Sequence, residues 1–164
     1  MDILIRDAVE KDLKEIVEIY NQAIVAKIST SDIATFNVED KREWFEEFSK
    51  EYPILVAEYE GKVVGWISIS PYRKGREGLK NTIMVSYYVH NEYKRKGVGD
   101  KLLKEMLERS KALGYKNIFG IIFDINIGSI KLLEKNGFKR WALLPDVVEI
   151  EGRIYSHLYL GRKI

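Results

Sequence analysis

Two glycines and three basic residues stand together just before a stretch of sequence with helical spacing of apolar residues. The segment consists of Lys94, Arg95, Lys96, Gly97, Val98 and Gly99. Free N–H groups at a helix start carry the positive end of the helix dipole, which suits a phosphate. A glycine lacks Cβ, so the main chain can approach an anion closely, and the basic side chains add attractive charge. The segment is therefore a candidate phosphate loop.

The same residues also fit a solvated basic turn before an ordinary helix, because Gly-x-Gly is common in that position. Two other phosphate-binding patterns do not fit. A dinucleotide fingerprint needs a third glycine and an acidic residue about 20 positions further on, and a Walker loop needs Gly-Lys followed by Ser or Thr. Neither pattern surrounds Gly97. The loop alone leaves the two interpretations open.

A second motif downstream makes the assignment specific. It runs from Asn126 to Phe138 and reads Asn-Ile-Gly-Ser-Ile-Lys-Leu-Leu-Glu-Lys-Asn-Gly-Phe. This segment resembles Asn-x-x-Ser/Ala-x-x-x-Tyr-Glu-Lys-x-Gly-Phe of the GNAT superfamily of acetyltransferases. Residues 94–99 resemble the Gln/Arg-x-x-Gly-x-Gly/Ala loop with which these enzymes bind acetyl-coenzyme A (acetyl-CoA). Lys94 replaces the first Gln or Arg and keeps a cationic donor there.

The resemblance implies how acetyl-CoA would be held. The strand that contains Tyr87, Tyr88 and Val89 would splay from the strand near Phe119–Phe123, and the pantetheine arm would add between them as an extra strand. A bulge amide near Tyr87 would polarise the thioester carbonyl and stabilise the developing oxyanion. The resemblance therefore assigns these three residues to the cofactor site, with the Tyr87 amide as a catalytic group.

Three further residues belong to the implied cofactor site. Asp100 follows the phosphate loop in the first turn of the predicted helix, and Asn126 and Ser129 open the second motif. Asn126 also suits a helix N-cap, a role that can exist alone or beside a cofactor contact. Ser129 is either a cofactor contact or a polar helix residue.

Nearly the whole chain resembles a narrower group, the phosphinothricin and methionine sulfoximine N-acetyltransferases. Matching segments include Ile19–Ile24, Glu43–Phe45 and Tyr52–Glu58. These enzymes acetylate the α-amino group of small amino-acid-like compounds and are typically homodimers, so a small-molecule amine acceptor and a homodimer are implied. The loop with Tyr72 and Arg73 would border the acceptor. Arg73 could grip a carboxylate or phosphinate bidentately, or could be a solvated loop arginine.

The sequence departs from this group at two positions that carry protons. Met84 stands where related enzymes often have the Glu of Thr-x-Glu-x-Ser, and Leu133 stands where many GNAT proteins have a Tyr general acid. Neither side chain can transfer a proton, so Met84 is expected to line the substrate pocket or the core. Tyr155 is the candidate proton acceptor. Two other functions fit the sequence: a coenzyme A-binding protein without catalysis, and an acetyltransferase for protein or peptide amines.

Composition excludes several other classes. The chain has no cysteine and two histidines, so disulfides, a Cys nucleophile and a metal site are not expected. Its 27 basic and 25 acidic residues are interspersed, which argues against nucleic-acid binding. The N-terminus lacks a signal-peptide pattern and no apolar run could span a bilayer. We therefore expect a cytoplasmic protein with one domain over residues 1–164.

The predicted elements must bring the two motifs together. Helical periodicity covers about residues 10–27, the stretch after Asn37 up to Pro53, the segment following Gly99 to Leu113, and residues 127–136. Strands are predicted at residues 2–7, 54–59, 62–70, 82–90, 116–124, 138–148 and 153–161, with Glu60-Gly61 and Glu151-Gly152 as turns. This order predicts an α/β (α+β) GNAT fold, with a mixed, mostly antiparallel sheet of about six to seven strands, splayed in the middle, and helices on both faces.

Overall fold

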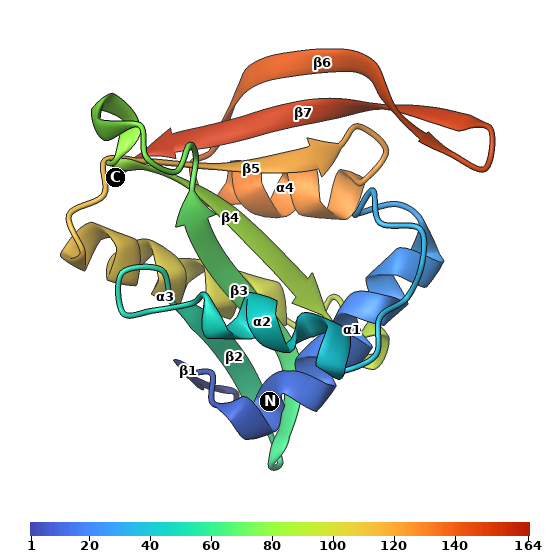
Figure 1. Ribbon diagram of the computed structural model, residues 1–164, viewed down its shortest axis with the longest axis vertical. Coiled ribbons are helices and arrows are strands. Elements are labelled where there is room, and N and C mark those ends of the chain that lie inside the picture. The colour runs from blue at the N-terminus through green and yellow to red at the C-terminus, as the bar shows by residue number, and fades with distance from the viewer.

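A seven-stranded sheet runs through the computed structural model, which describes all 164 residues (Figure 1). The strands lie in the order β1-β2-β3-β4-β5-β7-β6. They are β1 (Leu4–Asp7), β2 (Ile54–Tyr59), β3 (Lys62–Pro71), β4 (Thr82–Val89), β5 (Asn117–Phe123), β6 (Lys139–Ile150) and β7 (Arg153–Lys163). All neighbouring strands are antiparallel except β4 and β5. The predicted mixed, mostly antiparallel sheet is confirmed.

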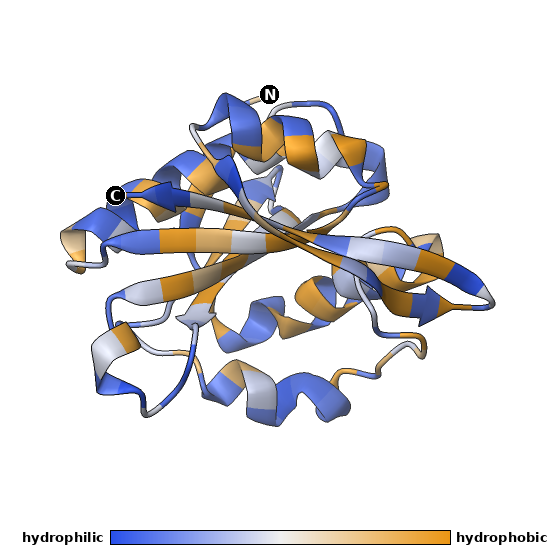
Figure 2. Ribbon diagram, turned by 90° about the horizontal axis from the view of Figure 1, so that it is seen from above, coloured by the Kyte–Doolittle hydropathy of each residue, from blue (hydrophilic) through white to orange (hydrophobic).

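Four α-helices cover the two faces of the sheet. They are α1 (Leu13–Ala26), α2 (Arg42–Glu46), α3 (Val98–Ala112) and α4 (Ile127–Lys135). Figure 2 shows the strands as a layer with helices above and below it. Leu102 and Met106 of α3 pack with Ile67 of β3 on one face, and Ile16 of α1 packs with Trp66 on the other. None of these helices combines the length and the apolar character that a membrane-spanning segment needs.

Alternation along β3 decides which side chains face each helical layer. Ile67 and Ile69 point into the large core beneath α3, whereas Trp66, Ser68 and Ser70 point towards α1 and α2. The cross-strand partners on β4 follow the same alternation, so Ser86 and Tyr88 lie beside Ser68 and Trp66. One face of β3 and β4 is therefore mainly aliphatic, and the other mixes aromatic rings with small hydroxyl groups.

β4 and β5 are paired for only three residues. Thr82, Ile83 and Met84 of β4 lie opposite residues 117–119 of β5, and beyond them the two strands have no paired residues. Figure 1 shows β4 and β5 diverging from this point, with α4 behind β5. The predicted splay in the middle of the sheet is confirmed.

Most element boundaries agree with the prediction, and the clearest difference is in the second helical stretch. Asn37 does act as a cap, accepting from the Asp40 N–H at 3.0 Å, but α2 has only five residues and is preceded by a short 3-10 turn. Phe48 therefore lies beyond the helix end, although its ring still meets that of Trp44 edge to face, with centroids 4.9 Å apart. Five residues cannot form a stable helix alone. The contacts of Trp44 with Phe48 and Trp66 therefore hold α2 in place.

Candidate active site

The predicted phosphate loop joins β4 to α3 in a conformation that exposes main-chain N–H groups. Arg95 and Gly97 have φ of 62° and 84°, both in the left-handed region, and α3 begins at Val98 without a side-chain cap. Residues 94–97 are exposed. The left-handed residues Arg95 and Gly97 turn the chain sharply, and the uncapped helix start leaves further main-chain donors free. The loop has the geometry of an anion site.

The two glycines of the loop serve different purposes. A Cβ added to Gly97 would meet no atom within 4 Å, so this glycine is required by its φ and leaves open space in front of the loop. A Cβ at Gly99 would lie 3.0 Å from Cδ2 of Leu132. Gly99 therefore permits the close packing of α3 on α4. From the sequence, Gly99 was expected to let the main chain approach the anion closely.

Asp100 places a carboxylate in the first turn of α3, where it could oppose an anion. The carboxylate instead pairs with Lys104 of α3 at 2.8 Å and, across to α4, with Lys135 at 3.3 Å, and it accepts from Asn136 Nδ2 at 2.9 Å. The hydrogen bonds from Lys104 and Asn136 lower the pKa of Asp100 to about 2. Its charge is therefore offset locally, and it braces α3 against α4.

The main-chain groups of β4 alternate in direction, and this alternation places the Tyr87 amide in the gap. The Thr82 carbonyl and the His90 N–H both bond towards β3, so even-numbered residues face β3 and odd-numbered ones face β5. The N–H and C=O groups of Val85, Tyr87 and Val89 consequently point to where β5 has diverged.

The bulge expected near Tyr87 is absent, because β3 and β4 keep one register from Gly65 opposite Val89 to Pro71 opposite Ile83. The nearby register shift lies between β2 and β3, at Ala57 and Glu58. The divergence of β5 alone frees the Tyr87 amide, and an extra residue in β4 is unnecessary. The expectation of a bulge is therefore corrected, while the position of the amide is as expected.

The second motif forms α4, which borders the gap. Asn126 Oδ1 accepts from the Ser129 N–H at 3.2 Å, so Asn126 is the N-cap of α4, and its Nδ2 makes no hydrogen bond. The Tyr87 hydroxyl donates to the Ser129 carbonyl at 3.4 Å, which ties β4 to α4 across the open end of the sheet. Burial raises the pKa of Tyr87 to about 12, so this hydroxyl stays protonated at neutral pH. Asn126 therefore caps the helix and retains a free donor.

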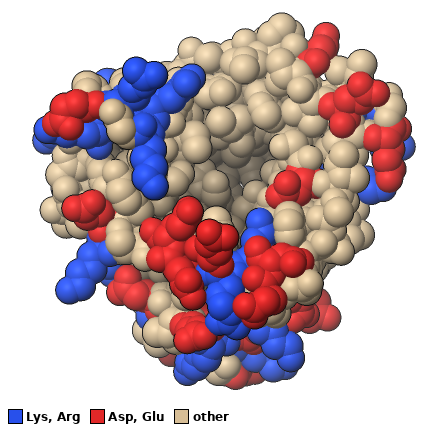
Figure 3. Space-filling view, viewed as in Figure 1, with Lys and Arg blue, Asp and Glu red and all other residues tan.

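A cavity of about 160 Å³ lies on the other face of β3 and β4, beneath α1 and α2. Figure 3 shows this face of the molecule hollowed at its centre, with mostly uncharged residues around the hollow and a mixture of acidic and basic side chains below it. The lining residues are Ile16, Val17, Tyr20, Lys41, Trp44, Phe48, Trp66, Ser68, Ser70, Ser86 and Tyr88. Because Ser86 and Tyr88 flank Tyr87 in β4, the cavity adjoins the strand segment that carries the free amide.

Tyrosines and tryptophans fix the inner wall of this cavity. The Trp66 Nε1 donates to the Ile16 carbonyl at 3.1 Å, and the Tyr20 ring lies 5.0 Å from that of Tyr88. The Tyr20 hydroxyl donates to the Asp32 carboxylate, and it lies 2.9 Å from the Thr30 hydroxyl. Burial raises the pKa of both tyrosines, to about 12 for Tyr88. These contacts hold the aromatic part of the wall in place, and both tyrosines are neutral at neutral pH.

The three predicted acceptor residues, Tyr72, Arg73 and Met84, lie near the cavity, but none of them lines it. Met84 is half-buried beside Ser70 of β3 and Phe119 of β5. The Tyr72 ring contacts that of Phe119 at 5.1 Å. Arg73 is exposed in an adjoining groove that shares Trp44, Phe48 and Ser70 with the cavity, and its guanidinium lies 5.4 Å from the Tyr72 ring.

Tyr155, the candidate proton acceptor, and Leu133, which replaces the usual Tyr, both lie away from the cavity, on β7 and on α4. Tyr155 of β7 stacks on Phe123 with ring centroids 5.6 Å apart, and it does not line the cavity. Leu133 of α4 is fully buried in the core beneath the opposite face. The structure brings no carboxylate into the cavity lining in place of the usual Glu.

Sequence reasoning missed several cavity residues, notably Tyr20, Lys41 and Trp66. A usable signal was present in β3, where Trp66, Ser68 and Ser70 alternate with Ile67 and Ile69. Small hydroxyl residues at every second position of an otherwise apolar strand indicate a face that is not filled by the core.

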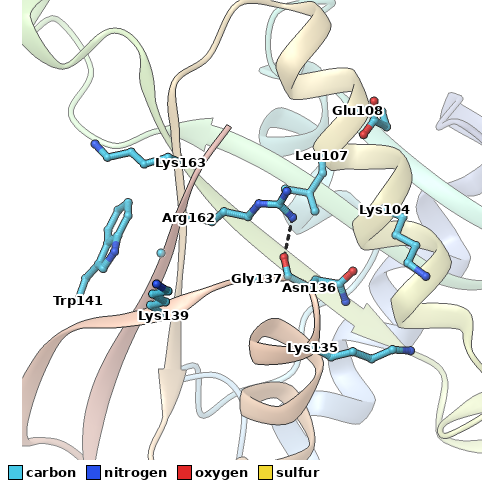
Figure 4. Close-up of a pocket in the computed structure, with 11 residues that line it drawn as sticks. Lys104, Leu107, Glu108, Lys135, Asn136, Gly137, Lys139, Trp141, Arg162 and Lys163 are labelled. Carbon is cyan, nitrogen blue, oxygen red and sulfur yellow. Dashed lines mark hydrogen bonds between the residues drawn. The ribbon is translucent and has the colours of Figure 1, made fainter.

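A larger open groove lies away from both the loop and the cavity, between α3, the end of α4 and the ends of β6 and β7 (Figure 4). Lys104, Lys135, Arg162 and Lys163 line it, and Arg162 donates to the Asn136 carbonyl at 2.6 Å. It contains none of the residues expected to bind cofactor or acceptor. We therefore take the loop, the gap and the cavity as the candidate active site.

Comparison with known proteins agrees with this geometry. The model of the acetyltransferase (GNAT) family matches residues 13–138. The chain belongs to this family, and the class that the fold and site define is that of the GNAT acetyltransferases.

Within the family the chain is similar to enzymes that act on amino-acid-like compounds. It is 38% identical over 161 residues to YwnH of Bacillus subtilis, provisionally named a phosphinothricin acetyltransferase, with 98% of each chain covered. It is 33% identical to an L-methionine sulfoximine/L-methionine sulfone acetyltransferase of Pseudomonas aeruginosa, covering 93% of this chain and 90% of that one. A crystal structure of a Sinorhizobium meliloti phosphinothricin acetyltransferase in complex with acetyl-CoA superposes with a TM-score of 0.94, at 28% identity, over 100% of this chain and 89% of that one.

Proposed function

We propose that the protein transfers the acetyl group of acetyl-CoA to the primary amine of a small amino-acid-like acceptor. The observation that carries this proposal is the parting of β4 and β5 after Met84, which leaves the Tyr87 amide free between the phosphate loop and the cavity. Acetyl-CoA supplies an activated acetyl thioester. β4 borders both proposed sites, because the gap for the cofactor lies along its edge and the acceptor cavity lies on its face.

The residues present fit acetyl-CoA. The uncapped start of α3 and the open space at Gly97 suit a diphosphate, and Lys94, Arg95 and Lys96 surround it with positive charge. The main-chain groups of Tyr87 and Val89 suit an extended amide-containing chain. We assign the Tyr87 N–H to the oxygen of the reacting carbonyl, Val98 and Asp100 to the helix start, and the free Asn126 Nδ2, beside Ser129, to a polar group of the cofactor.

Alignment of the two reactants is proposed to do most of the catalysis. The α-amino group of a peptide titrates near 7.7–8.0. The carboxylate of a free amino acid raises the pKa of its amine above that range, so the minor neutral fraction of the acceptor is the form that attacks. Alignment can contribute roughly 7–11 kcal/mol, whereas a positioned acid or base typically contributes about 10²–10⁴-fold. The proton acceptor is proposed to be water or Tyr155. Tyr155→Phe should lower kcat without changing the acceptor KM if the hydroxyl takes part, and an unchanged kcat removes it from the mechanism.

The acceptor class comes from the relatives and from the cavity. Similar proteins are named for methionine sulfoximine, methionine sulfone and phosphinothricin, and one from Escherichia coli is an L-amino acid N-acyltransferase. We propose acceptors of this type, bordered by Tyr72, Arg73 and Met84. The test is thiol release from acetyl-CoA with a panel of amino acids, sulfoximines, polyamines and peptides. Turnover confined to peptides, or to polyamines, would refute the acceptor class.

A second candidate function is coenzyme A binding without catalysis. It is favoured by the presence of Met84 and Leu133 where proton-transferring groups are usual. Tight acetyl-CoA binding in calorimetry, with no thiol release across the whole panel, would support it and would refute the acetyltransferase proposal.

The expected homodimer is also proposed, with β6 as part of its interface. β6 is an edge strand, and its Trp141, Leu143 and Val147 are 45%, 58% and 51% exposed. Exposed apolar groups on an unpaired edge mark an interaction surface. Light scattering should give the mass of a dimer, and Leu143→Lys should shift it to a monomer; a monomeric wild type would refute this proposal. The cytoplasmic location stays an expectation from the sequence.

A further inference from the structure

One cation lies in the wall of the acceptor cavity, and it is not among the residues expected to bind substrate. The Lys41 ammonium lies 3.9 Å from the centroid of the Phe36 ring, 5.2 Å from that of Tyr20 and 5.8 Å from that of Trp44. Lys41 is half-buried and lines the cavity with Tyr20 and Trp44. Aromatic faces hold an ammonium in place without neutralising it.

Four carboxylates in the segments next to Lys41 or its aromatic partners bond to other groups. Its neighbour Arg42 pairs with Glu39 at 3.0 Å and with Glu10 at 2.7 Å. Asp40 accepts from the Asn37 N–H at 2.9 Å. The Asp32 carboxylate accepts from the Tyr20 hydroxyl. Lys41 takes part in none of the ion pairs of the chain, so no carboxylate is paired with the one cation that lines the cavity.

Lys41 is also the only formally charged residue in the cavity lining. The other ten residues are apolar or aromatic side chains and three serines, and none is a carboxylate. A cavity with one partly desolvated cation favours a ligand that carries one anionic group, since such a pair forms charge-assisted hydrogen bonds in a low dielectric. The same field disfavours a second cation on the ligand.

From this arrangement we propose that Lys41 selects the acceptor by binding its carboxylate. The inference rests on the proposed acetyltransferase function and narrows its acceptor class. The acceptor is an α-amino acid whose carboxylate meets Lys41 and whose uncharged side chain packs among Trp44, Trp66 and Tyr88. Simple primary amines, polyamines and amino acids with cationic side chains are poor acceptors. Arg73, in the adjoining groove, does not replace Lys41.

The test compares two amines that differ only in the carboxylate. L-methionine sulfone and its decarboxylated analogue, 3-(methylsulfonyl)propan-1-amine, are assayed with wild type, Lys41→Met, Lys41→Arg and Lys50→Met. Lys50 is an exposed lysine beyond α2 and lines none of the grooves described, so Lys50→Met controls for loss of one positive charge. Lys41→Met should lower kcat/KM for methionine sulfone by about 10- to 100-fold. Its effect on the decarboxylated amine should be less than about threefold, and Lys41→Arg should retain most of the activity.

Each outcome decides a different point. If Lys41→Met lowers kcat/KM for both amines equally, or for neither, the inference fails although the acetyltransferase function stands. If the wild type turns over no amine of the panel, the proposed function fails, and the inference fails with it.

Binding gives a separate readout, because Trp44 and Trp66 line the cavity and Trp141 is outside it. In a Trp141→Phe background with coenzyme A present, methionine sulfone should change the tryptophan fluorescence when Lys41 is retained. The same addition should leave the fluorescence unchanged when the Lys41→Met substitution is added to that background. An equal change in both proteins would show that the acceptor binds without Lys41 and would overturn the inference.

Discussion

Gly97 allows the phosphate loop to be tested with a matched pair of substitutions, Gly97→Glu and Gly97→Lys. Any residue with a Cβ is strained by the φ of 84° at this position, at a cost of about 1–2 kcal/mol in stability. No atom lies within 4 Å of the added Cβ, so neither substitution clashes with the folded chain. The two variants should therefore be equally destabilised, and they differ only in the sign of the charge that they place before the loop.

That difference in charge sets the size of the expected effect. A unit charge about 4 Å from another contributes about 1 kcal/mol in water and about 4 kcal/mol at the effective dielectric of a protein surface. Because the two variants differ by two charge units, the Glu variant should bind acetyl-CoA more weakly than the Lys variant by at least about 2 kcal/mol, or about 30-fold. Both should bind more weakly than wild type, because a side chain fills the open space. The difference in acetyl-CoA affinity between the two variants should decrease at high salt, because salt screens exposed charges.

Isothermal titration calorimetry with acetyl-CoA measures the affinities, and thermal unfolding checks that both variants are folded and equally stable. Equal affinities of the folded Glu and Lys variants would show that no phosphate lies near residue 97. Wild-type affinity in both would remove the loop from the cofactor site altogether.

Three further predictions follow from the site. Gly99→Ala should leave the acetyl-CoA affinity within about threefold of wild type, because the added Cβ would face Leu132 and not the cofactor. The free energy of unfolding should change by less than about 1 kcal/mol, since the higher helix propensity of Ala offsets the tight contact. A tenfold loss of acetyl-CoA affinity in calorimetry would contradict the packing role of Gly99. Asp100→Asn should lower the free energy of unfolding by up to about 2 kcal/mol at neutral pH. The folded-state pKa of Asp100 is below the unfolded value, so its contribution is complete above pH 3.8 and is lost as the pH falls towards about 2, and urea unfolding of both proteins should converge over that range. Arg73→Ala should raise the acceptor KM with near-normal affinity for acetyl-CoA; unchanged kinetics for every accepted amine would take Arg73 out of the site.

Local signals in the sequence were sufficient for much of the fold. The Glu60-Gly61 dipeptide between two β-rich runs predicts a hairpin, and both residues have the positive φ, 50° and 76°, that such a turn requires. Gly114 and Gly137, predicted to end α3 and α4, both have positive φ as well. These features depend on neighbours in the sequence, which is why they could be predicted.

The acceptor cavity depends on contacts between distant segments and could not be predicted in the same way. Lys41 and Trp66 meet Tyr20 only because α1 and the segment around α2 pack on the same face of β3. The splay of β4 from β5 was expected only through the resemblance, since nothing in the residues 85–89 forbids pairing. Met84 shows the limit of the resemblance, because a missing carboxylate does not reveal which group replaces it.

A sheet that parts in its middle has four open margins for an added strand where an ordinary sheet has two. The two outer edges resist the addition of a long strand, because β1 is only four residues long and β6, which we propose as part of the dimer interface, is interrupted by register shifts near Trp141 and Pro145. The inner pair, along residues 85–89 and 120–123, is protected by shape, because the two strands diverge from a shared origin and α4 closes one side. Only a single narrow, flexible chain can enter such a wedge, so the fold can display unpaired backbone without inviting other sheets to join it.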